Sequence, residues 1–188
     1  MKKQRWEVRL VGQGGQGVAL DGIILAEAAV RDGKNTVMNH IYGAQKRGGP
    51  SQADMIMSGE EIDYPKVLDA DLLVIFSESA FDEYHHQLGN HGLLVFDSSQ
   101  IKRALAKHDR VIPIPFADIS HQATGSSLSA NMVALGFVVE LTKLVSHRAL
   151  AGAVRKHSPK GRLQANQTAM EKGTQRAESI KYRHDWNY

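Results

Sequence analysis

Two unbroken apolar runs constrain the fold of this chain more than any other feature of its sequence. They occupy residues 72–76 (Leu-Leu-Val-Ile-Phe) and 93–96 (Leu-Leu-Val-Phe). A strand with one solvated face alternates polar and apolar residues, whereas a continuous apolar run is typical of a strand that is covered on both faces. We therefore expect a three-layer molecule, in which a central sheet has helices on either side.

The segments around these runs alternate between strand-like and helix-like patterns. Strand-like patterns occupy residues 7–11, 35–39, 52–58, 72–76, 93–96 and 110–114, and helix-like patterns occupy residues 17–31, 79–88 and 99–108. Pro113 favours an edge position for the last strand, because proline cannot donate a hydrogen bond to a neighbour. This order predicts an α/β fold with a mainly parallel sheet and a Rossmann-like start.

The last third of the chain is helical in pattern. Ser129 is positioned to cap a helix that continues to Val145, and two further helices are expected over residues 147–155 and 163–172. After Gly173 the sequence becomes polar. We therefore expect one domain over residues 1–173, which ends in helices, and a polar C-terminal extension over residues 174–188.

Composition excludes several classes of protein. The chain has 188 residues, of which 42% are hydrophobic and 23% charged, so disorder along its whole length is not expected. It has no cysteine, which rules out disulfides, cysteine-ligated zinc and cysteine-held iron–sulfur clusters within the chain. The net charge of +3 does not call for nucleic acid, and no apolar stretch is long enough to span a membrane. A cytoplasmic protein with no nucleic-acid or membrane partner is expected.

A glycine loop separates the first strand from the first helix. Residues 12–17 read Gly-Gln-Gly-Gly-Gln-Gly and fit the G-x-G-x-x-G pattern in the strand–helix context that gives this pattern its meaning. Backbone N–H groups at such a junction bind phosphate. Gly12, Gly14, Gly15, Gln16 and Gly17 are therefore the candidate cofactor-binding residues. The alternative is that the glycines only allow close strand–helix packing. No acidic residue ends the second strand, which weakens a nicotinamide interpretation.

A second glycine-rich loop follows the second strand. Arg47 precedes two glycines, and its guanidinium could bind a carboxylate or a phosphate at the carboxyl edge of the sheet. Tyr42, Arg47, Gly48 and Gly49 are therefore the candidate interface or ligand residues. The alternative is a solvated loop that only reverses the chain.

Together these motifs resemble the gamma subunit of 2-oxoacid:ferredoxin oxidoreductases. The resemblance rests on the two glycine loops and on the segments at residues 24–28, 62–65, 71–74 and 131–136, and it covers roughly residues 6–173. It implies a subunit of an assembly that decarboxylates a 2-oxoacid, passes electrons to ferredoxin and forms acyl-coenzyme A. Residues 62–67 favour 2-oxoglutarate as substrate, with pyruvate, branched 2-oxoacids and indolepyruvate left open.

The resemblance also divides the chemistry among chains. Thiamine diphosphate, Mg²⁺ and iron–sulfur clusters are expected in partner alpha and beta subunits, with a ferredoxin-like delta subunit in some assemblies, and coenzyme A is the co-substrate. We nominate no catalytic residue and no metal ligand in this chain, and we expect it to be inactive alone. His85, His86 and His91 are interpreted as exposed histidines.

Two other classes of function stay open on the sequence. One is a stand-alone nucleotide-binding oxidoreductase that uses the glycine loop, and the other is a non-enzymatic binding module of the same fold. A titration with NADH tests the first, and genes for thiamine-dependent and cysteine-rich chains beside this one would favour the subunit.

Overall fold

The computed structural model describes residues 5–42, 49–103 and 110–180. Its strands are β1 (Arg5–Gln13), β2 (Asn35–Tyr42), β3 (Pro50–Ser58), β4 (Ala70–Ile75), β5 (Leu88–Asp97) and β6 (Val111–Ile114). Its α-helices are α1 (Val18–Arg31), α2 (Glu78–Tyr84), α3 (Phe116–Thr124), α4 (Ala130–Thr142), α5 (His147–His157) and α6 (Leu163–Ser179), with short 3₁₀ turns η1 (His85–Gln87) and η2 (Ser127–Ser129).

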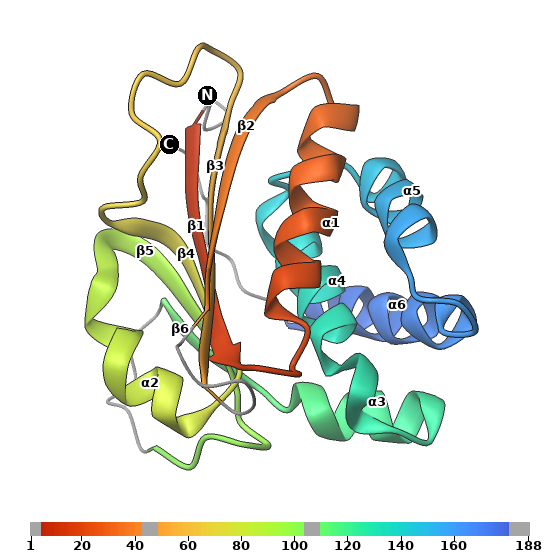
Figure 1. Ribbon diagram of the computed structural model, residues 1–188. Helices are drawn as coiled ribbons and strands as arrows, with labels where there is room; N and C mark the ends of the chain where they lie inside the picture. Colours follow the sequence, from red (N-terminus) through yellow and green to blue (C-terminus); the bar gives the residue numbers. More distant parts are fainter. Residues whose placement is uncertain (1–4, 43–48, 104–109, 181–188) are drawn as a thin grey trace.

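The six strands form one sheet in the order β2-β3-β1-β4-β5-β6 (Figure 1). β1, β4, β5 and β6 pair in parallel, whereas β3 pairs antiparallel with both β1 and β2. All strands except β3 therefore point the same way, which confirms the α/β class and the mainly parallel sheet. The Rossmann-like start extends only through α1, because β3 and not β2 lies beside β1.

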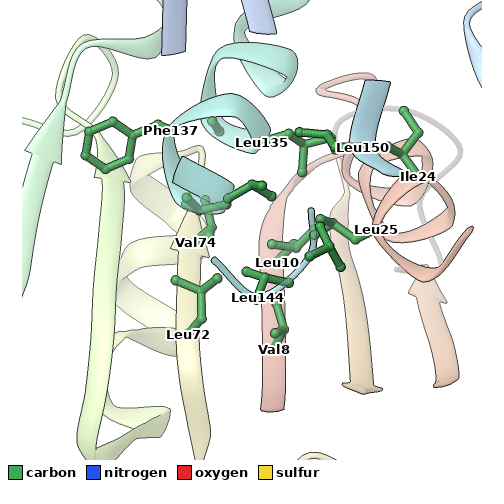
Figure 2. Close-up of a cluster of buried hydrophobic side chains, with 14 of the residues drawn as sticks. Val8, Leu10, Ile24, Leu25, Leu72, Val74, Leu135, Phe137, Leu144 and Leu150 are labelled. Atoms are coloured by element: carbon green, nitrogen blue, oxygen red, sulfur yellow. The ribbon is translucent and has the colours of Figure 1, made fainter. Parts of the chain in front are cut away.

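Helices cover both faces of the sheet, as the apolar runs predict. α1, α4, α5 and α6 lie on one face, and α2 lies on the other (Figure 1). Figure 2 shows the larger apolar cluster, in which Val8, Leu10, Leu72 and Val74 of the strands meet side chains of the helical layer. A second cluster on the opposite face includes Phe81 of α2. No helix among the described residues is long and apolar enough to cross a membrane.

Two glycines allow α4 and α6 to touch backbone to backbone. A Cβ atom on Gly136 of α4 would lie 1.9 Å from the carbonyl oxygen of Met170, and one on Gly173 of α6 would lie 2.0 Å from the carbonyl oxygen of Val133. Gly173 is therefore a packing residue inside a helix. α6 continues past it to Ser179, so the expected helix end at residue 172 is wrong; the domain division at Gly173 stays a prediction.

Two other helix expectations also need correction. The helix expected over residues 99–108 is not found in its described part, because residues 99–103 form a turn and coil, and the rest of that range lies outside the described residues. α4 ends at Thr142 and not at Val145, because the next residue, Lys143, adopts a left-handed conformation with φ 54°. The edge position of Pro113 in β6 is confirmed.

Candidate functional site

Parallel strands bring the two glycine motifs to one edge of the sheet. β1 and β2 both end there, at Gln13 and Tyr42, and the antiparallel β3 begins there. The N–H of Gly14 donates to the carbonyl oxygen of Gly49 at 2.9 Å, so the first loop rests on the end of the second. Tyr42 is 71% exposed at the same edge. Arg47 and Gly48 lie outside the described residues.

The conformation of the first loop requires glycine at two positions. Gly15 has φ 99° and Gly17 has φ 85°, values in the left-handed region that L-residues other than glycine rarely adopt. Gln16 braces the loop from within: its Oε1 accepts from the N–H of Gln13 at 2.7 Å, and its Nε2 donates to the carbonyl oxygen of Phe76 at 3.1 Å. The Gln16 side chain therefore holds the turn in shape.

The loop still presents backbone donors. Among the described residues, none accepts a hydrogen bond from the N–H of Gly15 or Gly17. These donors precede the first turn of α1, where the N–H groups also lack intrahelical partners and the helix dipole is positive. The arrangement fits a ligand with acceptor oxygens, which is the general property that the motif predicts.

A pocket of about 210 Å³ opens beside the loop. It lies between the loop and the N-terminal ends of α3 and α4, and its lining residues are Gly15, Gln16, Phe76, Asp97, Gln100, Ala117, Ser127, Leu128, Ala130 and Asn131. This lining contains one carboxyl group and no lysine or arginine. The pocket therefore suits a polar, uncharged part of a ligand better than a diphosphate.

Asp97 at the end of β5 organises the α3 side of the pocket. Its Oδ1 accepts from the N–H of Ser99 at 2.9 Å, and its Oδ2 accepts from the N–H of Ala117 at 3.3 Å, in the first turn of α3. Burial raises the pKa of this carboxyl above its usual value, against the effect of these hydrogen bonds. Because Asp97 already occupies the N-terminus of α3, that terminus is not open to an external anion.

A buried Asp–Asn pair joins α1 to α4 beside the glycine loop. Asn131 Nδ2 donates to Asp21 Oδ1 at 2.8 Å, and the second carboxyl oxygen of Asp21 has no partner among the described residues. Burial raises the pKa of Asp21 well above its usual value. A Cβ atom on Gly17 would lie 2.3 Å from Asn131 Nδ2, so glycine is needed at residue 17 for space as well as for conformation.

Neither Asp21 nor Asn131 is among the candidate residues predicted from the sequence. Asp21 falls among the inward-facing positions of α1, with Val18, Leu25 and Ala28. An acid on the apolar face of a helix is the signal that could have revealed a buried carboxyl. Its partner Asn131 is separated from it by 110 positions, and no local pattern links the two.

The structure supports neither a metal site at the histidines nor a nicotinamide site at β2 among the described residues. The ring of His85 bonds through Nδ1 to the carbonyl oxygen of Phe81 at 2.8 Å and stacks on the Phe81 ring. The part of the chain that the structure describes holds no group of three metal-ligating side chains. β2 carries no carboxylate, and its partner strand β3 separates it from β1, so the acidic residue that holds the ribose in a dinucleotide fold has no counterpart there.

Comparisons with known proteins agree with this architecture. Residues 7–176 match the family described as pyruvate ferredoxin/flavodoxin oxidoreductase. The chain is 35% identical to 2-oxoglutarate synthase subunit KorC of Methanocaldococcus jannaschii, over 95% of this chain and 97% of that protein. The crystal structure of the keto/oxoacid ferredoxin oxidoreductase gamma subunit from Geobacter sulfurreducens superposes with a TM-score of 0.82 at 33% identity, covering 94% of this chain and 98% of that one.

A larger oxidoreductase contains the same fold. The 2-oxoglutarate:ferredoxin oxidoreductase from Magnetococcus marinus, solved with 2-oxoglutarate, coenzyme A and succinyl-CoA bound, superposes with a TM-score of 0.85 at 23% identity, over 98% of this chain and 33% of that chain. The chain belongs to the pyruvate ferredoxin/flavodoxin oxidoreductase family. Its relatives are subunits of 2-oxoacid oxidoreductase enzymes, which confirms the family resemblance found in the sequence.

Proposed function

We propose that this chain is the gamma subunit of a 2-oxoglutarate:ferredoxin oxidoreductase. The assembly would decarboxylate the 2-oxoacid, pass the electrons to ferredoxin and transfer the acyl group to coenzyme A. The observation that carries the proposal is 35% identity over almost the whole length of a 2-oxoglutarate synthase subunit. The absence of cysteine agrees with a division of labour in which other chains hold the iron–sulfur clusters.

The proposal assigns the redox chemistry to partner subunits of the cytoplasmic complex. Alpha and beta subunits would hold thiamine diphosphate, Mg²⁺ and the clusters, and a ferredoxin-like delta subunit would complete some assemblies. Thiamine diphosphate supplies the carbanion chemistry when bound, and this chain supplies binding and orientation. The chain alone would be inactive.

Co-expression with the thiamine-dependent and cysteine-rich partner subunits tests this function. The purified complex should reduce ferredoxin with 2-oxoglutarate and coenzyme A, and should turn over pyruvate, 3-methyl-2-oxobutanoate and indolepyruvate far more slowly. Equal turnover of pyruvate would refute the choice of 2-oxoglutarate and leave the family assignment intact. A complex that is fully active without this chain would refute its role as a required subunit.

The glycine loop is proposed to contact coenzyme A. The support is chemical: Gly15 and Gly17 present backbone donors, and the adjacent pocket lining mixes amide, hydroxyl and apolar side chains with the single carboxyl group of Asp97, which suits the amide-rich pantetheine arm. The cation that the diphosphate needs would come from Arg47 or from a partner subunit, since the described pocket lining holds none. On this proposal Gly14→Val and Gly17→Val raise the KM for coenzyme A. An unchanged KM in folded, assembled variants would leave the loop as a packing device.

Arg47 is proposed to meet a phosphate or an acidic group of a partner, with Tyr42, Gly48 and Gly49 beside it. Tyr42 is exposed, and Gly49 holds the glycine loop, so both fit a contact region at this edge. Loss of one member of a desolvated charge pair costs about 2–5 kcal/mol. Arg47→Ala should therefore weaken assembly or coenzyme A turnover more than about tenfold, with partial rescue by Arg47→Lys. A change below about threefold would favour the solvated loop.

A further inference from the structure

β2 forms one edge of the sheet and, among the described residues, lacks the usual protection of an edge strand. β2 has eight residues (Asn-Thr-Val-Met-Asn-His-Ile-Tyr), pairs only with β3 among the described residues, and contains no charge and no proline. Natural proteins block exposed edges with lysine, proline, bulges or covering segments, because unpaired N–H and C=O groups invite another strand. β2 keeps an even register with β3 along its whole length and ends in the exposed Ile41 and Tyr42.

An apolar stripe on α1 points past the same edge. Ala19, Ile23, Ala26 and Val30 follow the 4-3-4 spacing of a helix–helix contact, and Ile23 is 41% and Val30 60% exposed. Leu25 of α1 packs beside Leu10 of β1 (Figure 2), whereas a Cβ atom on Gly22 would meet Met38 of β2. Around the helix, Leu25 faces β1, Gly22 faces β2, and the stripe comes next in the same rotation. It therefore faces outward beyond β2.

The two features fit one arrangement, in which a second copy pairs through β2. Neighbouring strands lie about 4.8 Å apart, and α1 lies over β2 and β3, so two copies of α1 flanking a β2–β2 pair would be separated by roughly 10–14 Å. Helices in contact pack about 8–10 Å apart, which is the near end of this range, and the exposed side chains Ile23 and Val30 would fill the space between the two helices. Neither β2 nor the stripe carries a charge that would repel its own copy across a two-fold axis.

We propose that β2 and the α1 stripe form a two-fold interface with a second copy of this chain, so that the two sheets join edge to edge. The stripe (Ala19, Ile23, Ala26, Val30) would pack against the same stripe of the other copy, as expected for an isologous contact. This inference stands apart from the proposed activity, since it depends only on the strand edge and the helix face.

Solution mass tests the proposal on the purified full-length chain. Light scattering should give twice the monomer mass of 20.7 kDa. Ile41→Lys and Val30→Glu place a charge at exposed positions of the strand and the stripe, and each should raise the dimer dissociation constant more than about tenfold. Leu68→Lys, at an exposed apolar residue on the other side of the sheet, is the matched control and should leave the dimer unchanged.

Single cysteines give a second readout, because the natural chain has none. Pairing of β2 with its own copy is reported by three single variants, Val37→Cys, Asn39→Cys and Ile41→Cys. In an antiparallel pair with a two-fold axis, a residue lies opposite its own copy only near the axis. The disulfide yield should therefore peak at one of the three positions and fall at the others. The peak should disappear when Val30→Glu is added.

Several results would overturn the proposal. A wild-type chain that stays at the monomer mass, or a dimer that survives both charged variants and yields no β2 cross-link, excludes this interface. Variants that fold as stably as wild type but fail to bind the partner subunits, with the chain itself monomeric, would show that another subunit covers the edge.

Discussion

The two left-handed glycines of the loop provide a matched pair of substitutions. Gly15 and Gly17 have similar positive φ values, but a Cβ atom on Gly15 would have no neighbour within 4 Å, whereas one on Gly17 would lie 2.3 Å from Asn131 Nδ2. Both alanine variants therefore carry the conformational cost, and only Gly17→Ala carries an overlap. The comparison separates the two reasons for glycine.

The magnitudes follow from the surroundings. A left-handed alanine costs about 1–2 kcal/mol, so Gly15→Ala should destabilise the chain by about that much. In Gly17→Ala the Asn131 amide must also move by roughly 1 Å to restore ordinary contact near 3.5 Å. That movement breaks its hydrogen bond to Asp21 and leaves buried polar groups unpaired, at a further cost of about 1–3 kcal/mol.

Urea unfolding of both variants, with m-values checked for equality, measures the difference. Adding Asn131→Ala should remove the overlap, so the double variant with Gly17→Ala should be more stable than additivity predicts by about 0.5–3 kcal/mol. Equal destabilisation by Gly15→Ala and Gly17→Ala would refute the reasoning, because conformation alone would then explain the requirement. A strictly additive double variant would likewise remove Asn131 from the explanation.

Three further predictions concern the core. Gly136→Ala should destabilise the chain by more than about 3 kcal/mol in urea unfolding, because the new methyl group meets the backbone of Met170 and the helices must separate. In the wild type, the folded state keeps the proton of Asp21 to a higher pH than the unfolded state does, so stability falls as pH rises from about 4 toward the raised pKa of Asp21. Asp21→Asn should remove this loss, so the stability of the variant relative to the wild type should increase with pH in parallel unfolding curves. In the wild type, the buried Arg9 guanidinium donates two hydrogen bonds of 2.7 Å to the carboxylate of Asp54. Asp54→Asn leaves this buried charge without its counter-ion, so it should lower the free energy of unfolding by about 3–5 kcal/mol, measured by thermal unfolding.

The elements that the sequence predicts well are those whose signals are local. The continuous apolar runs form β4 and the inner part of β5, and the glycine loop lies at the expected strand–helix junction. Each of these features depends on residues within a few positions of one another. Periodicity and glycine conformation are therefore sufficient to find them.

The features that escaped prediction depend on partners distant in the sequence. α3 lacks a local cap, because Pro115 precedes it and its N-terminal amide bonds to Asp97 of β5. Gly173 resembles a helix stop, and only the neighbouring backbone of α4 explains why a glycine lies inside α6. The insertion of β3 between β1 and β2 is a matter of strand order, which hydrophobic periodicity does not encode.

The helical layer links these distant contacts to the loop. α6 holds α4 through the glycine contact at Gly136 and through the hydrogen bond from Ser129 Oγ to Asn166 Oδ1 at 2.8 Å. α4 in turn lies against the loop, because Asn131 bonds to Asp21 of α1 and fills the space beside Gly17. Interiors are close-packed, so a shift of α4 moves Asn131 with it. Gly136→Ser or Ser129→Ala should therefore raise the KM for coenzyme A, the ligand proposed for the loop, before it unfolds the chain, although neither residue lines the pocket.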